Sequence, residues 1–155
     1  MKRIRKLFFL IVILSLLVNH PLSVMANSNN TSNVTKEFLD DGSYFEITIE
    51  SNDNQRTSIK NASKTLTYKN SNGEALWYAK VIANFYYDGT TSSCTSSSAS
   101  SGTYVSGWKI LSSSSSRTGN TASATVTAGI YYVGVLVDSI TVKVLLSCDK
   151  NGNLS

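Results

Sequence analysis

The stretch ALWYAKVIANFYY, residues 75–87, decides the fold of this chain. Its side chains alternate with a period of two, which is the period of a β-strand. One face is wholly apolar and consists of Trp77, Ala79, Val81, Ala83 and Phe85. The other face is mixed and carries Tyr78, Lys80, Ile82, Asn84 and Tyr86. The segment therefore predicts a strand whose first face lies in a hydrophobic core and whose second face meets solvent.

The same alternation recurs on both sides of this segment. Asn72-Gly73 and Asp88-Gly89 predict tight turns at its two ends, because such residue pairs tolerate positive φ angles. The serine-rich segments 96–102 and 112–116 predict loops, and Gly134 predicts a bulge or bend within a strand. Strands are expected at 43–50, 64–69, 75–87, around Cys94, 104–110, 121–128, 130–137 and 139–148.

About seven or eight short strands, with turn signals roughly every 8–12 residues, predict an all-β fold. No helical periodicity follows residue 26. The expected architecture is a single antiparallel β-sandwich of about 7–8 strands with an immunoglobulin-like topology. A sheet closed on itself is the alternative. Small residues alternate along 121–128, which predicts that a bulky side chain such as Trp77 or Trp108 packs over them.

The first 26 residues have the three parts of a secretory signal peptide. Four of the first six are basic, and the apolar run from Leu7 to Val18 is interrupted only by Ser15. A run of about 12 residues suits a signal sequence and falls short of the roughly 20 that span a bilayer. Val24 and Ala26 predict cleavage after Ala26, with an uncleaved anchor as the alternative. The expected divisions are a signal peptide at 1–26, a flexible leader at 27–41 and a β-sandwich domain at 42–155.

Removal of the signal peptide changes which functions the composition allows. The net charge of +4 comes from 14 basic and 10 acidic residues, and residues 1–26 contain four of the basic ones and no acid. The secreted, extracellular product is therefore expected to be neutral, which argues against a nucleic-acid partner. The chain's one histidine, His20, also lies in the signal. Serine-nucleophile triads and zinc sites of the ordinary kind are excluded without it, so we expect no enzyme, no cofactor and no metal.

Two cysteines, Cys94 and Cys148, remain after cleavage. Two cysteines in an exported chain usually pair, so we predict a disulfide between them. Closing that loop of about 54 residues would stabilise the fold by roughly 4 kcal/mol in the chain-entropy treatment. The alternative is a reactive thiol, although cysteine nucleophiles of the papain kind need a histidine partner.

Acidic residues offer two weaker candidate sites. Glu46 and Glu50 share one strand face, but four residues of strand separate them by about 13 Å. Paired carboxylates of glycosidases lie about 5–9.5 Å apart, so a solvated edge is the favoured interpretation. Oxygen ligands at 52–54, with Asp40 and Asp41 upstream, suit calcium, but their spacing matches no EF-hand loop and favours a plain turn.

The candidate binding residues are Tyr78, Tyr86 and Tyr131, which are expected on the face opposite Trp77. Exposed tyrosines stack on sugars or anchor a protein partner, and cross-strand pairing that stabilises the sheet is the alternative. We therefore predict a secreted non-enzymatic binding domain for a glycan, a cell-wall component or a protein. The alternative function is a secreted toxin or antimicrobial protein that acts at membranes. Otherwise the chain should meet a membrane only transiently, during export.

Several segments together resemble a family of small secreted proteins. They are 41–44 (DGSY), 64–70 (KTLTYKN), 76–77 (LW), 94–96 (CTS), 108–110 (WKI) and 148–155 (CDKNGNLS). With the signal peptide and the two cysteines, they are similar to secreted Firmicutes proteins, from clostridia and ruminococci, that have one C-terminal β domain and no assigned function. The resemblance extends from about residue 41 to the last residue and implies a Gram-positive, extracellular setting. It transfers no activity and no site.

Overall fold

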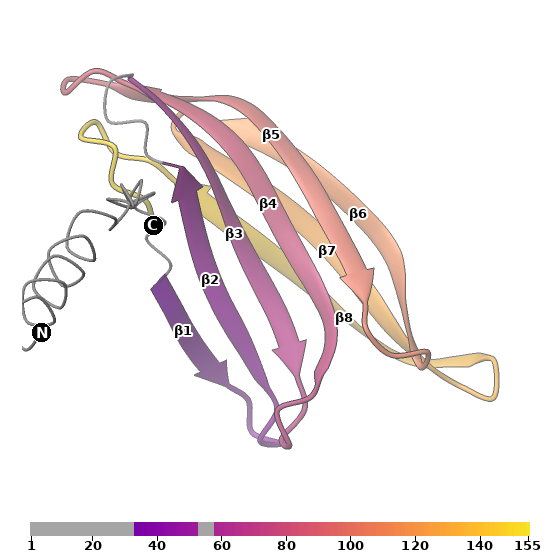
Figure 1. Cartoon of the computed structure of the whole chain (residues 1–155). Coiled ribbons are helices and arrows are strands. Elements are labelled where there is room, and N and C mark those ends of the chain that lie inside the picture. The colour runs from indigo at the N-terminus through magenta and orange to yellow at the C-terminus, as the bar shows by residue number, and fades with distance from the viewer. Residues whose placement is uncertain (1–32, 53–57) are drawn as a thin grey trace, which may run out of the picture.

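The structure, a computed structural model, describes residues 33–52 and 58–155. The signal peptide and the first part of the leader lie outside these residues, so the predicted cleavage after Ala26 stays a prediction. The described residues form eight strands and no helix (Figure 1). The strands are β1 (Asn33–Phe38), β2 (Tyr44–Asn52), β3 (Ile59–Lys69), β4 (Ala75–Tyr87), β5 (Ser92–Thr103), β6 (Trp108–Thr118), β7 (Thr121–Tyr132) and β8 (Val135–Ser147).

The eight strands make two antiparallel sheets, which confirms the predicted all-β class. Strands β1 to β5 form one sheet in that order, and β6 to β8 form the other. Within each sheet, every strand therefore pairs with its neighbour in sequence. The immunoglobulin-like topology is not confirmed, because a Greek key places strands that are not consecutive beside each other. The turn at Asn72-Gly73, where Gly73 has φ +84°, returns β4 directly onto β3.

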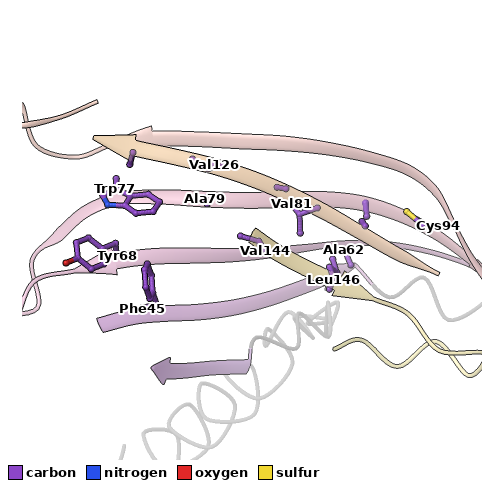
Figure 2. Packing of buried hydrophobic residues seen from close by; sticks show 14 of the residues in the cluster. Phe45, Ala62, Tyr68, Trp77, Ala79, Val81, Cys94, Val126, Val144 and Leu146 are labelled. Carbon is purple, nitrogen blue, oxygen red and sulfur yellow. The ribbon is translucent and has the colours of Figure 1, made fainter. Parts of the chain in front are cut away.

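One hydrophobic core contains residues from the inner faces of both sheets. On β4 the predicted core face is confirmed, since Trp77, Val81 and Phe85 are fully buried. Across from it, Ala122 and Val126 of β7 are equally buried, and these small residues share the core with both tryptophans. Large aromatic side chains gather at one end of the core, where Figure 2 shows Phe45, Tyr68 and Trp77. Tyr68, Trp77 and Trp108 lie within 6.0 Å of one another, centroid to centroid.

Three segments that read as irregular in the sequence are strands. Residues 33–38 of the predicted flexible leader form β1, which pairs with β2 along its whole length. The serine-rich segments 96–102 and 112–116 belong to β5 and β6, where their backbones pair with β4 and β7. Serine has little preference for strands, so the neighbouring strand determines the conformation of such a segment by accepting and donating its backbone hydrogen bonds.

The segment 130–137 is the opposite case, because a predicted single strand is a hairpin. β7 ends at Tyr132 and β8 begins at Val135, with Val133 and Gly134 as a two-residue turn. Their φ angles are +50° and +80°, as a type I′ turn requires. Gly134 therefore reverses the chain instead of marking a bulge. The hairpin extends beyond the β5–β6 connection at the lower right of Figure 1.

The predicted disulfide is absent: no bond joins Cys94 to Cys148, although both side chains are buried. Each sulfur faces a carbonyl of its own segment, at 3.2 Å from Ser96 O for Cys94 and 3.5 Å from Asp149 O for Cys148. The β6–β7 turn contacts both cysteines, since the Cys94 amide donates to Gly119 O and the Cys148 amide to Asn120 O. Backbone hydrogen bonds to this turn, together with a hydrogen bond from Ser92 Oγ to Cys148 O at 2.7 Å, connect the two cysteine-bearing segments in place of a covalent bond.

Candidate functional site

The structure places two of the three predicted tyrosines on one face. Tyr78 and Tyr86 both lie on the outer face of β4, in the five-stranded sheet. Tyr131 lies on β7 in the other sheet, where Lys109 Nζ is 4.5 Å from the centre of its ring. The three tyrosines are therefore not one surface. The outer face of the five-stranded sheet keeps Tyr78 and Tyr86, and Tyr131 belongs to a different region of the molecule.

Tyr78 has a partner that the sequence did not identify. Its ring lies against Gly102 of β5, where an added Cβ would come within 2.8 Å of the Tyr78 Cε1 atom. Tyr104, just beyond β5, lies 5.8 Å from Tyr78 between ring centres and is 58 % exposed. The Tyr78 hydroxyl is 3.5 Å from Ser100 Oγ. An aromatic pair thus lies beside a glycine and a hydroxyl group, and more than half of its Tyr104 member is exposed to solvent.

The signal that points to Tyr104 is the pairing register of β4 and β5. Tyr78 is opposite Gly102, so the residue two positions further along lies diagonally across from Tyr78, within reach of an aromatic ring. That register depends on recognising 96–102 as a strand. Because the sequence predicted a loop there, it did not predict the contact between Tyr78 and Tyr104.

The two glutamates of β2 are each engaged with a lysine on the same outer face. Glu46 Oε1 lies 2.9 Å from Lys69 Nζ, and Glu50 Oε2 lies 3.6 Å from Lys80 Nζ. The hydrogen bond from Lys69 to Glu46 is the main reason that the pKa of Lys69 is raised. These ion pairs supply fixed polar groups of both signs beside the tyrosines.

A polar pocket is lined by residues of β2, β3 and β4. It has a volume of about 260 Å³ and opens to solvent. Lys80 and Ile82 of β4 line it, and these residues stand between the two tyrosines along the strand. From the neighbouring strands the lining includes Glu50, Asn52, Asn61 and Ser63. The pocket combines one exposed apolar side chain with amide, hydroxyl and charged groups, as pockets for small polar ligands do.

Together these features form a strip along β4, here named the tyrosine strip, which runs from Tyr78 to Tyr86. Eight residues of strand make it about 26 Å long. Small hydroxyl side chains flank it, because Ser100, Ser98 and Ser96 of β5 pair in turn with Lys80, Ile82 and Asn84. Serine side chains are too small to cover the neighbouring strand. The tyrosine strip is therefore accessible to a ligand from the β5 side.

The remaining candidate sites are not assembled. Asp40 and Asp41 precede β2 and Asn52 ends it, so the proposed calcium ligands lie at opposite ends of that strand. Asp53 and Asn54 lie outside the described residues. Among residues 33–52 and 58–155, no group of three His, Cys, Asp or Glu side chains is close enough to hold a metal ion. That same part of the chain contains no helix with the length and apolar character to cross a membrane.

Comparison with known proteins adds no identity. No family model matches the chain, and no curated protein and no solved structure is significantly similar to it. The residues of the two sheets are therefore the sole basis for assigning a function.

Proposed function

We propose that the protein is a secreted, non-enzymatic binding domain whose tyrosine strip binds an extended glycan. The observation that carries the proposal is the arrangement along β4, where Tyr78 and Tyr86 lie on either side of Lys80 and Ile82, two residues that line a polar pocket. A ligand that contacts both tyrosines must be about 26 Å long. Chain-like saccharides of the cell surface have such dimensions and alternate apolar ring faces with hydroxyl edges.

The side chains of the strip suit this chemistry. Aromatic faces stack against the C–H faces of sugar rings and exclude water from them. Hydroxyl, amide and charged groups of the pocket exchange hydrogen bonds with sugar hydroxyls and fix the orientation of the ligand. The ion pairs of Lys69 with Glu46 and Lys80 with Glu50 hold their side chains in place, so less side-chain entropy is lost when a sugar binds.

The proposal also includes the extracellular location that the sequence predicts. A signal peptide cleaved after Ala26 delivers the domain outside the cell, and the resemblance to secreted Firmicutes proteins makes a cell-wall glycan of a Gram-positive surface the first ligand to test. The carboxylates of Glu46 and Glu50, on the strand β2, bind and position the ligand in this proposal and perform no catalysis.

The experiment is a glycan array followed by titration calorimetry with the best ligand. Tyr78→Ala and Tyr86→Ala should each weaken binding at least tenfold, which corresponds to the loss of about 1.4 kcal/mol of stacking. Gly102→Ala is a subtler variant, because its new methyl group displaces the Tyr78 ring without removing it. We expect it to weaken binding by less than Tyr78→Ala does.

Tyr132→Ala is the matched control, since Tyr132 is 74 % exposed and lies on the other sheet. It should bind the glycan as the wild type does. The proposal is refuted when no glycan on a broad array binds, or when Tyr132→Ala lowers affinity as much as Tyr78→Ala does.

A further inference from the structure

The tip of the β7–β8 hairpin exposes a continuous apolar surface. Val133 is 86 % exposed and Tyr132 74 %, the two highest exposures among the large apolar side chains of the described residues. Val135, Leu136 and Val137 on the returning strand are also exposed. The segment 131–137 (YYVGVLV) contains no charged residue. Exposed apolar patches of this extent mark sites that bind a partner.

The shape of the tip limits what the partner can be. Each arm of the segment 131–137 is three residues long, so the tip projects about 10 Å from its base. In Figure 1 the tip extends beyond the connection between β5 and β6. Its five exposed side chains present on the order of 500 Å² of apolar surface. A stable protein interface buries about 800 Å² on each partner, so a second copy of this chain held by the tip alone would make too small a contact.

We propose that this tip docks the protein on a lipid bilayer by entering its interfacial region. Apolar segments that lie at a membrane surface reach about 5–10 Å below the headgroups, which is the depth that the projection of segment 131–137 provides. Tyr131 stands at the base of the tip, where aromatic side chains meet the polar and apolar layers. Tyr132 and Val135 lie opposite each other next to the turn, and Val133 in the turn itself reaches deepest.

The backbone of the hairpin suits a medium with few hydrogen-bond partners. Tyr132 lies opposite Val135 beside the turn, and the Tyr131 amide donates a hydrogen bond to Gly107 O at 2.8 Å. Unpaired backbone groups are costly to move into lipid. A two-residue turn leaves few of them at the tip, whereas an open loop of the same composition would leave several.

Charges near the base match a membrane surface and limit insertion. Lys109 lies over the Tyr131 ring, at the level where lipid phosphates lie when the tip is inserted. Asp138 is the first charged residue of β8 after the tip, and its carboxylate accepts a hydrogen bond from the Ser139 amide at 2.7 Å. A buried charge is expensive in lipid, so Asp138 stops the hairpin at the interface and the domain does not span the bilayer.

The test measures binding of the exported protein to vesicles of phosphatidylcholine with phosphatidylglycerol. Val133→Ser with Val135→Ser should lower the partition coefficient at least tenfold, while leaving the fold intact because both side chains are outside the core. The matched control is Val34→Ser with Leu145→Ser, which removes two exposed aliphatic side chains elsewhere, at 56 % and 47 % exposure. That pair should partition as the wild type does.

A second readout reports depth. A Tyr132→Trp variant should shift its emission to the blue on binding and be quenched by lipids brominated near the headgroup end of the acyl chain. Trp77 and Trp108 are buried in the core and provide a constant background.

The proposal fails if the wild type does not partition, if both double variants partition alike, or if the Tyr132→Trp emission does not change. A concentration-dependent dimer that the Val133→Ser and Val135→Ser changes abolish would assign the tip to a second copy of the chain and overturn the lipid assignment. The tip variant should still bind the glycan ligand of the tyrosine strip. Failure of one proposal is therefore distinguishable from failure of the other.

Discussion

The C-terminal turn offers the sharpest test of the packing, through a Gly152→Ala substitution. Gly152 is buried with φ +85°, and a Cβ there would lie 2.8 Å from two ring carbons of Tyr87. Its carbonyl also accepts a hydrogen bond from Lys60 Nζ at 2.6 Å. The turn thereby holds the ends of β3 and β4 together with the last residues of the chain.

The cost of Gly152→Ala has two parts. An alanine at positive φ costs about 1–2 kcal/mol, and forcing a methyl group into a filled space costs about 1–3 kcal/mol more. Gly89→Ala is the matched control, because Gly89 has φ +84° and no atom lies within 4 Å of the position that a Cβ would occupy there. It should show the first cost alone. The free energy of unfolding should therefore fall by about 1–3 kcal/mol more for Gly152→Ala than for Gly89→Ala.

Urea unfolding and thermal melting measure this difference, which corresponds to roughly 4 °C in Tm for each kcal/mol in a domain of this size. A double-variant cycle assigns the cause, since the extra cost of Gly152→Ala should vanish in a Tyr87→Ala background. Equal losses for Gly152→Ala and Gly89→Ala would refute the reasoning. So would an extra cost that persists without the Tyr87 ring.

Two further predictions concern titrating groups. Burial raises the pKa of the Cys94 thiol. Because the thiolate is the reactive form, iodoacetamide should label Cys94 at neutral pH far more slowly in the folded protein than in urea. Equal labelling rates, measured by peptide mapping, would contradict this prediction. Hydrogen bonds from the Thr91 and Thr90 amides, at 2.7 and 2.9 Å, lower the pKa of Asp88 below its usual 3.8. A lowered carboxyl pKa stabilises the fold above the unfolded-state value and ceases to do so as the pH falls through the folded-state value. The difference in Tm between wild type and Asp88→Asn should therefore shrink below about pH 3.8, and a difference that is constant from pH 6 to 2.5 would contradict the assignment.

Strand 75–87 was predictable because its apolar residues carry the pattern by themselves. All five residues of its predicted inner face are buried, as the alternation requires. The segments 96–102 and 112–116 carry no such pattern, since nearly every residue is serine. Whether a serine segment becomes a strand depends on the unpaired edge that the neighbouring strand offers, and a single sequence does not reveal that edge.

The sequence predicted which tyrosines of one strand share a face. It did not predict which sheet each strand belongs to. Tyr78 and Tyr86 are separated by an even number of residues in one strand, so they must share a face. Tyr131 follows the same alternation in its own strand, but alternation does not say to which sheet a strand belongs. The hairpin was missed for a related reason, because 130–137 is apolar on both sides of Gly134 and reads as one continuous strand.

The positions of the two proposed surfaces make them compatible. The tyrosine strip runs along β4, and the apolar tip stands at one end of the β7–β8 hairpin, in the opposite sheet. In Figure 1 the strands of both sheets run in similar directions, so the strip extends away from the end that bears the tip. A domain inserted by its tip would hold the strip upright above the bilayer, with both tyrosines free to bind. Vesicles coated with the protein should therefore capture the glycan with the affinity that the free protein has, and a loss of affinity on the vesicle would show that the two surfaces compete.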